Sequence, residues 1–208
     1  MLDQALSTFA PHEHQWEPRK VFLFSGHRVD ERNRRTPRFP NATLNIDIAQ
    51  QAITEGLANF DAGPEDLALT QGACGGDLLF TKASLQLGLR VQWLQPFAEP
   101  DFIRHSVACG GEQWRACYFE LKSQLGLPIR HAPEVLGPLP TGADLGDAYE
   151  RGNRWLLCSA LSYGTEKIHF ICLWDGDAGD GRGGTQHMLD EVSARTDHVK
   201  ILDTRTLW

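Results

Sequence analysis

The sequence predicts an α/β protein with a doubly wound, mainly parallel sheet and helices on both faces. Short apolar runs typical of buried strands alternate with longer segments whose apolar residues recur at helical spacing. Three of the predicted strands also end in glycine-bearing loops. Ligands of doubly wound sheets bind beyond the carboxyl ends of the strands, so these three loops are the predicted site.

The predicted elements follow one another along almost the whole chain. Strands are expected at residues 20–26, 66–72, 90–97, 167–175 and 198–203, and helices at 43–60, 76–88, 144–164 and about 184–195. The segment 101–126 is helical in parts and broken at two glycines, and 127–142 is loop-rich with room for one short strand. Residues 1–19 lack a clear period and are interpreted as an N-terminal arm, and residues 20–208 as a single domain.

Composition narrows the class of protein. The chain has 208 residues, of which 41% are hydrophobic and 23% charged, as in ordinary globular proteins. Its apolar runs are too short to span a bilayer, its N-terminus lacks a signal-peptide pattern, and its net charge of −7 argues against general nucleic-acid binding. The five cysteines show no CxxC pairing and indicate reduced thiols, not a disulfide frame or a zinc site. We therefore expect a cytoplasmic protein with no membrane partner, and a homodimer is left open.

The first glycine-bearing loop reads SGHR. Ser25 and Gly26 offer a hydroxyl and backbone amides, and His27 and Arg28 follow at once. Arginine suits a phosphate because its planar guanidinium donates two parallel hydrogen bonds. The alternative is a solvated basic loop whose histidine caps a strand. That alternative is favoured for the arginines farther along the loop, of which Arg38 is the last.

The second loop reads GACGGD. Gly72, Gly75 and Gly76 let the backbone turn tightly and approach a ligand, and the helix that follows points its free amides toward an anion. Asp77 is expected to cap the first turn, with a ribose hydroxyl as the alternative partner. Cys74 is expected to fill the tight turn, although a helix N-terminus also favours a reactive thiolate.

The third loop reads GDGRGGT and precedes a predicted helix. It formally contains G-x-G-x-x-G, but it leaves the strand several residues too early for a dinucleotide fingerprint. A calcium loop fails as well, because Gly179 stands where an oxygen ligand is needed and Gln186 replaces the bidentate glutamate. The backbone amides of Gly183 and Gly184 and the hydroxyl of Thr185, at a helix N-terminus, suit a phosphate.

Acidic residues surround the third loop. Asp175, Asp177 and Asp180 would repel a phosphate unless Arg182 or a Mg²⁺ ion lies between them, or unless they face sugar hydroxyls. Mg²⁺ carried with a nucleotide is therefore the one cofactor that the sequence suggests. Trp174, beside the loop, is interpreted as a core residue, with stacking on a base as the alternative.

Three stretches taken together carry a family resemblance. VFLFSGHR, TQGACGGDLLFTKASLQLGLRVQWLQPF and ICLWDGDAGDGRGGTQHMLDE resemble, in order, the SLOG superfamily, a Rossmann-like group that includes Smf/DprA and the "lonely guy" enzymes. The resemblance spans residues 20 to about 203. It implies a Rossmann-like fold and a nucleotide or nucleotide-derived ligand, bound by the loops at Ser25–Arg28, Gly72–Asp77 and Gly183–Thr185.

The enzymes of that superfamily hydrolyse the N-glycosidic bond of nucleoside monophosphates. They use a P-G-G-x-G-T-x-x-E motif and an arginine on the preceding helix. Here the proline is missing, and Met188 stands three residues after Thr185, where the glutamate is expected. The resemblance offers Glu191 and Arg154 (or Arg151) for catalysis in its place. Loss of the glutamate favours a ligand-sensing module over a phosphoribohydrolase or an NAD-cleaving hydrolase, and a scaffold with a vestigial pocket is the third alternative.

Overall fold

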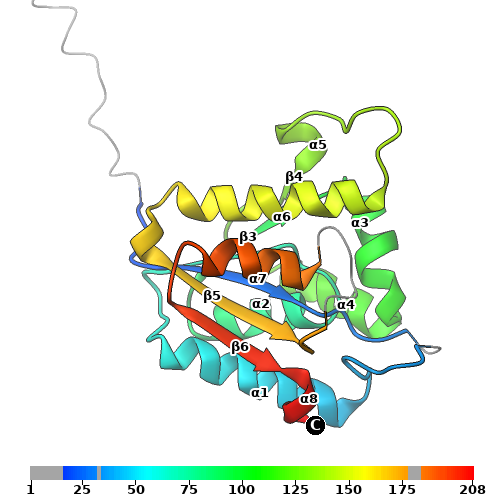
Figure 1. Cartoon of the computed structure of the whole chain (residues 1–208), viewed down its shortest axis with the longest axis horizontal. Helices are drawn as coiled ribbons and strands as arrows, with labels where there is room; N and C mark the ends of the chain where they lie inside the picture. The colour runs from blue at the N-terminus through cyan, green and yellow to red at the C-terminus, as the bar shows by residue number, and fades with distance from the viewer. Residues whose placement is uncertain (1–15, 32–33, 178–183) are drawn as a thin grey trace, which may run out of the picture.

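The described chain is built around one parallel sheet. The computed structural model describes residues 16–31, 34–177 and 184–208. These residues form a six-stranded sheet in the order β4-β3-β2-β1-β5-β6, and every neighbouring pair is parallel. Helices cover both faces (Figure 1). The predicted α/β fold class, a Rossmann-like doubly wound sheet, is confirmed.

Each predicted strand and helix is present, with ends that shift by a few residues. The strands are β1 (Val21–Gly26), β2 (Leu67–Thr70), β3 (Arg90–Gln95), β4 (Arg130–His131), β5 (Ile168–Trp174) and β6 (Val199–Asp203). The α-helices are α1 (Thr43–Asn59), α2 (Gly76–Gln86), α3 (Glu99–Phe102), α4 (Glu112–Lys122), α5 (Ala132–Val135), α6 (Leu145–Leu161), α7 (Thr185–Ser193) and α8 (Thr204–Leu207). A π-helical turn η1 (Ile103–Val107) and the 3₁₀ turns η2 (Ala108–Gly110) and η3 (Thr165–Lys167) complete the elements.

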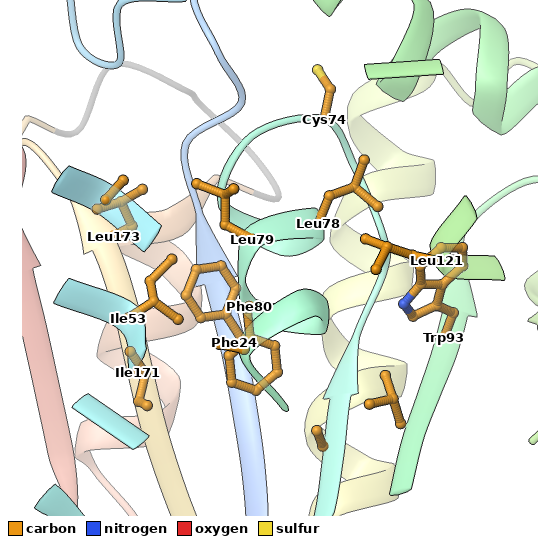
Figure 2. Packing of buried hydrophobic residues seen from close by; sticks show 14 of the residues in the cluster. Phe24, Ile53, Cys74, Leu78, Leu79, Phe80, Trp93, Leu121, Ile171 and Leu173 are labelled. Carbon is orange, nitrogen blue, oxygen red and sulfur yellow. The ribbon is translucent and has the colours of Figure 1, made fainter. Parts of the chain in front are cut away.

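The two faces of the sheet bury separate apolar clusters. Phe22 and Phe24 of β1 point to the cluster that α1, α2 and α4 cover, and Phe24 stacks on Phe80 with ring centroids 4.7 Å apart (Figure 2). Val21 and Leu23 point to the opposite cluster, which α6 and α7 cover. A strand buried on both faces needs apolar residues throughout, which is why β1 reads as a continuous apolar run. No helix among the described residues has the length and apolar character of a membrane span.

An ion pair lies at the amino ends of the strands. The carboxylate of Asp66, just before β2, is fully buried, and Arg19 donates to it from Nε at 3.0 Å and from Nη2 at 2.9 Å. The backbone amides of Lys20 and Gly63 donate to the same carboxylate. Residues 1–15 of the predicted arm lie outside the described residues, whereas Arg19 is joined to the domain by this pair.

The strand order places the predicted loops at one edge. From β1 the chain moves outward through β2, β3 and β4, and then returns to β5 on the other side of β1. Connections that leave in opposite directions open a crevice at the carboxyl ends of two adjacent strands, here β1 and β5. Gly26 pairs with Leu173 at this end, so the first and third loops start side by side.

The second loop tests how closely these loops pack. Gly75 has φ +95°, and a Cβ there would lie 2.6 Å from the backbone nitrogen of Val29 and 2.9 Å from the carbonyl oxygen of His27. We expect Gly75→Ala to lower the free energy of unfolding by at least about 1–3 kcal/mol in urea denaturation, because backbone atoms cannot move aside. Gly63→Ala is the matched control, since nothing lies within 4 Å of its added Cβ. Equal losses in the two variants would contradict the tight packing.

Candidate functional site

A cavity of about 260 Å³ lies at the carboxyl end of β1. Its walls come from the end of β1 and the loop after it, the loop after β2, one face of α6 and the N-terminus of α7. All three predicted loops therefore contribute to it. The cavity lies at the β1–β5 crevice, where a doubly wound sheet is expected to hold its ligand.

His27 joins the loops that surround the cavity. Its backbone N–H donates to the carbonyl of Leu173 at 3.0 Å, and its carbonyl accepts from the N–H of Gly76 at 3.1 Å. Its buried ring places Nε2 3.1 Å from both the backbone nitrogen and Oδ1 of Asp175. Asp175 was predicted to contact the ligand. In the structure its Oδ1 also accepts from the N–H of Asp177 at 3.0 Å, so this oxygen faces protein groups.

Two arginines from the loop after β1 line the cavity. Nη1 of Arg28 donates to the carbonyl of His105 at 2.6 Å, and its other guanidinium nitrogens make no hydrogen bond to the described residues. Arg38 was expected to be solvated, and the structure corrects this, because Arg38 is half-buried and lines the same cavity. The reason is a fold in the loop: Asp30 Oδ2 accepts the backbone N–H groups of Arg38 at 2.8 Å and Phe39 at 3.0 Å.

Asp77 closes the second loop on itself. Its Oδ2 accepts the backbone N–H groups of Gly72 at 3.1 Å and Ala73 at 3.2 Å. Burial raises the pKa of Asp77 to about 6, although these amides favour the ionised form. The helix α2 has Gly75 as its N-cap and no side-chain cap, so Asp77 holds the loop ahead of the helix and does not cap the first turn as expected.

Two further amides of the second loop also donate within the protein. The N–H of Cys74 donates to the carbonyl of Ser106 at 2.8 Å, and that of Gly76 donates to His27. The sequence predicted that the amides of this loop face an anion. In the structure, the amides of Gly72, Ala73, Cys74 and Gly76 have protein acceptors, because this loop packs against its neighbours.

The third loop presents a helix N-terminus to the cavity. Gly184 is the N-cap of α7 in an extended conformation, and Thr185, the first helical residue, is 6% exposed; both line the cavity. Among the described residues no side chain hydrogen-bonds to this N-terminus. The first-turn amides of an α-helix have no acceptor within the helix, and its dipole favours an anion there. Gly183, predicted with this pair, lies outside the described residues.

One face of α6 completes the cavity. Its lining residues recur at spacings of three and four: Gly146, Tyr149, Asn153 and Leu156. Asn153 Oδ1 accepts from Nε2 of Gln71 at 2.8 Å, and both side chains are buried. The sequence analysis missed these residues. The available signal was the pair Tyr149 and Asn153, polar groups four residues apart on the helix face that turns inward.

Arg154 and Glu191, two of the residues offered for catalysis, do not line the cavity. The side chain of Arg154 is 66% exposed, and its Nη2 pairs with Glu150 Oε1 at 2.7 Å. Arg154 follows Asn153 by one residue, which rotates it about 100° from the cavity-facing side of α6. Glu191 Oε2 pairs with Arg195 Nη1 at 2.9 Å, further along α7. The structure therefore does not bring the predicted pair together on the ligand.

Trp174 is hydrogen-bonded to the backbone of the loop that follows it. Trp174 Nε1 donates to the carbonyl of Asp177 at 2.9 Å, and its ring packs against the α6 and α7 cluster. The described residues hold no group of three or more histidine, cysteine or acidic side chains that suits a metal ion. Asp180 and Arg182 lie outside the described residues, so Mg²⁺ stays a prediction.

Comparisons with known proteins leave the family open. No family model matches the chain, and no curated protein matches it. The Moco carrier protein from Chlamydomonas reinhardtii is similar in structure: the two chains share 13% sequence identity, 91% of each chain is covered, and the TM-score is 0.36. A likeness of this degree carries no argument about the ligand. The SLOG resemblance stays a prediction.

The raised pKa of Asp77 gives a testable pH dependence. An aspartate with a folded-state pKa of about 6 and an ordinary value of about 3.9 stabilises the fold when protonated. Its contribution is therefore present below about pH 4 and is lost as the pH rises through about 6. Asparagine keeps the oxygen that accepts both amides and carries no charge. We expect the stability of Asp77→Asn relative to wild type to rise by roughly 1–3 kcal/mol from pH 4 to pH 7.

The measurement is urea denaturation of both proteins at several pH values. A stability difference that stays constant over this range would contradict the assignment, because it would mean that Asp77 titrates normally.

Proposed function

We propose that this protein binds a nucleotide or nucleotide-derived small molecule in the cavity at the β1–β5 crevice and acts as a ligand-sensing module. The observation that carries the proposal is the convergence of Arg28, Arg38 and the N-terminus of α7 on one cavity. Two guanidinium groups and a helix dipole favour an anion, and phosphate is the anion that this combination suits best.

The acidic group on the cavity does not cancel this charge. Asp77 is the carboxylate among the described lining residues, and its Oδ2 is turned toward the amides of its own loop. The nitrogens of Arg28 that make no hydrogen bond to the described residues can donate to a ligand phosphate. A hydrogen bond to a charged group contributes roughly 1.5–3 kcal/mol.

The size and walls of the cavity favour a compact ligand. Its volume of about 260 Å³ is close to the lower end of ordinary ligand pockets, roughly 300–1,000 Å³. Phe24, Tyr149 and Leu156 supply apolar surface for a base or sugar, and Asn153 and Ser25 supply polar groups. A mononucleotide matches this combination better than a dinucleotide.

Binding without cleavage is favoured over hydrolysis. N-glycosidic cleavage builds positive charge on the sugar, which a nearby carboxylate must stabilise. Met188 occupies the position of the expected glutamate and is 1% exposed in the core, and Glu191 pairs with Arg195. The alternative enzyme, a phosphoribohydrolase or NAD-cleaving hydrolase, lacks the expected glutamate among the described residues that line the cavity. The third alternative, a scaffold with a vestigial pocket, is not favoured, because the cavity keeps two arginines and a helix N-terminus on its walls.

Calorimetry with a panel of nucleotides tests the binding site. The panel holds mononucleotides, dinucleotides and Moco, the compound in the name of the similar Chlamydomonas protein. For the ligand that binds, we expect Arg28→Ala and Arg38→Ala each to weaken affinity at least about tenfold. Gly184→Val is expected to abolish binding, because the valine side chain would obstruct the approach of a ligand to the N-terminus of α7. The variant should still fold, since the φ of −76° and ψ of 172° at Gly184 also suit valine.

Arg35→Ala is the matched control, since Arg35 is exposed on the same loop and does not line the cavity. Equal losses from all three arginines would indicate a diffuse basic surface. Unchanged affinity in Gly184→Val would remove α7 from the site.

Turnover separates sensing from hydrolysis. We expect the purified protein to release no appreciable free base from AMP or NAD over a long incubation followed by chromatography. Glu191→Ala should give the same result as wild type. Release of base in excess over protein, lost in Glu191→Ala, would overturn the sensor proposal and make the protein an enzyme.

A further inference from the structure

Two cysteines far apart in the sequence lie in contact. Sγ of Cys74, in the loop after β2, is 3.4 Å from Sγ of Cys109, in the 3₁₀ turn η2. A disulfide has an S–S distance of about 2.05 Å, so the sulfurs need to approach by only about 1.4 Å. The other three cysteines have no such sulfur neighbour among the contacts of the described chain.

The backbone holds the two cysteines in this arrangement. The N–H of Cys74 donates to the carbonyl of Ser106 in η1, directly ahead of η2. Gly110 follows Cys109, and a Cβ at Gly110 would lie 3.1 Å from Cβ of Cys74, so glycine permits this approach. Cys74 lies at the end of the buried cluster near the loops, with its sulfur turned away from Phe24 and Phe80 (Figure 2). Irregular π-helical turns of the η1 kind recur at functional sites.

The two sulfurs differ in their surroundings. Cys74 is fully buried, whereas Cys109 is half-buried and lines an open hollow of about 290 Å³ together with Arg28 and Glu31. Nη1 of Arg28 lies 3.6 Å from Sγ of Cys109. A small reagent in solvent can therefore reach Cys109, and it meets a sulfur that is paired with a cation.

These surroundings also shift the pKa values of the two thiols in opposite directions. The hydrogen bond from Cys74, and then the charge of Arg28, lower the pKa of Cys109, against burial and the opposing charge of Glu31. The hydrogen bond to Cys109 and burial raise the pKa of Cys74. The phenol of Tyr149, which is hydrogen-bonded to Ser106, also interacts electrostatically with the pair. The two pKa shifts favour the thiolate on the accessible sulfur and the proton on the buried one.

We propose that Cys74 and Cys109 are a redox-active dithiol that hydroperoxides oxidise to a reversible disulfide. The Cys109 thiolate attacks a peroxide oxygen, the O–O bond breaks, and the sulfenic acid of Cys109 forms as the departing hydroxide takes a proton. The sulfur of Cys74 then attacks the sulfenic sulfur, the S–S bond forms and the S–O bond breaks. The hydroxyl leaves with the proton of Cys74 as water, so two thiols lose two electrons and hydrogen peroxide becomes two waters.

Mass spectrometry of the whole protein tests the proposal with hydrogen peroxide as the oxidant. We expect wild type to lose the mass of two hydrogen atoms and two of its five titratable thiols, and to regain both with dithiothreitol. Peptide mapping without reduction should join the peptides that hold Cys74 and Cys109. In Cys74→Ser, a sulfenic acid on Cys109 should persist and be trapped by dimedone. In Cys109→Ser, the reaction should slow at least about tenfold.

Cys158→Ser is the matched control, because Cys158 is more exposed than Cys109 and should not be needed for the linkage. At mildly acidic pH, iodoacetamide should alkylate Cys109 of wild type ahead of Cys158, since exposure alone would give the reverse order. Circular dichroism checks that each variant is folded, and the wild-type mapping needs no variant. An unchanged thiol count, a disulfide between other cysteines, or loss of the linkage in Cys158→Ser would overturn the proposal.

Discussion

The arrangement of the site depends on His27. Its backbone is bonded to β5 on one side and to the start of α2 on the other, and its buried ring meets Asp175. Three segments that the sequence separates by up to 148 positions are thereby held at one point. β1 pairs with both β2 and β5, so the sheet sets where the three loops start, but strand pairing provides no link between the loops beyond the strand ends. His27 provides that link, and the cavity walls are fixed as a result.

The same constraint explains the glycines of the second loop. Gly75 passes so close to the backbone of Val29 and His27 that no side chain fits. The amides of this loop meet Asp77, His27 and Ser106 in place of a ligand. Glycines next to a helix N-terminus are typical of anion sites, yet here close packing between loops accounts for them. The positive groups on the cavity come from Arg28, Arg38 and α7 instead.

Arg28 connects the two proposals. One nitrogen of its guanidinium donates to the carbonyl of His105 and lies near the sulfur of Cys109, and the residue also lines the cavity. A cation in this position lowers the free energy of a thiolate and of a ligand anion by the same electrostatic attraction. Because the charge of Arg28 acts on both, we expect the dithiol and the ligand cavity to be electrostatically coupled.

Sequence alone determined the elements and their class. The periodicity of apolar residues and the positions of glycines are local properties, so β1, β5, α1 and α6 were predictable, as were the three loops at strand ends.

Tertiary structure decided which side chains face the cavity. Arg38 returns to it because Asp30 folds the loop, Tyr149 and Asn153 reach it through the rotation of α6, and Arg154, one position on, points to solvent. The contact of Cys74 with Cys109 spans 35 positions, and only packing of the second loop against η2 creates it. Local sequence patterns do not predict contacts between residues far apart in the sequence, since these contacts depend on how whole helices, strands and loops pack against one another.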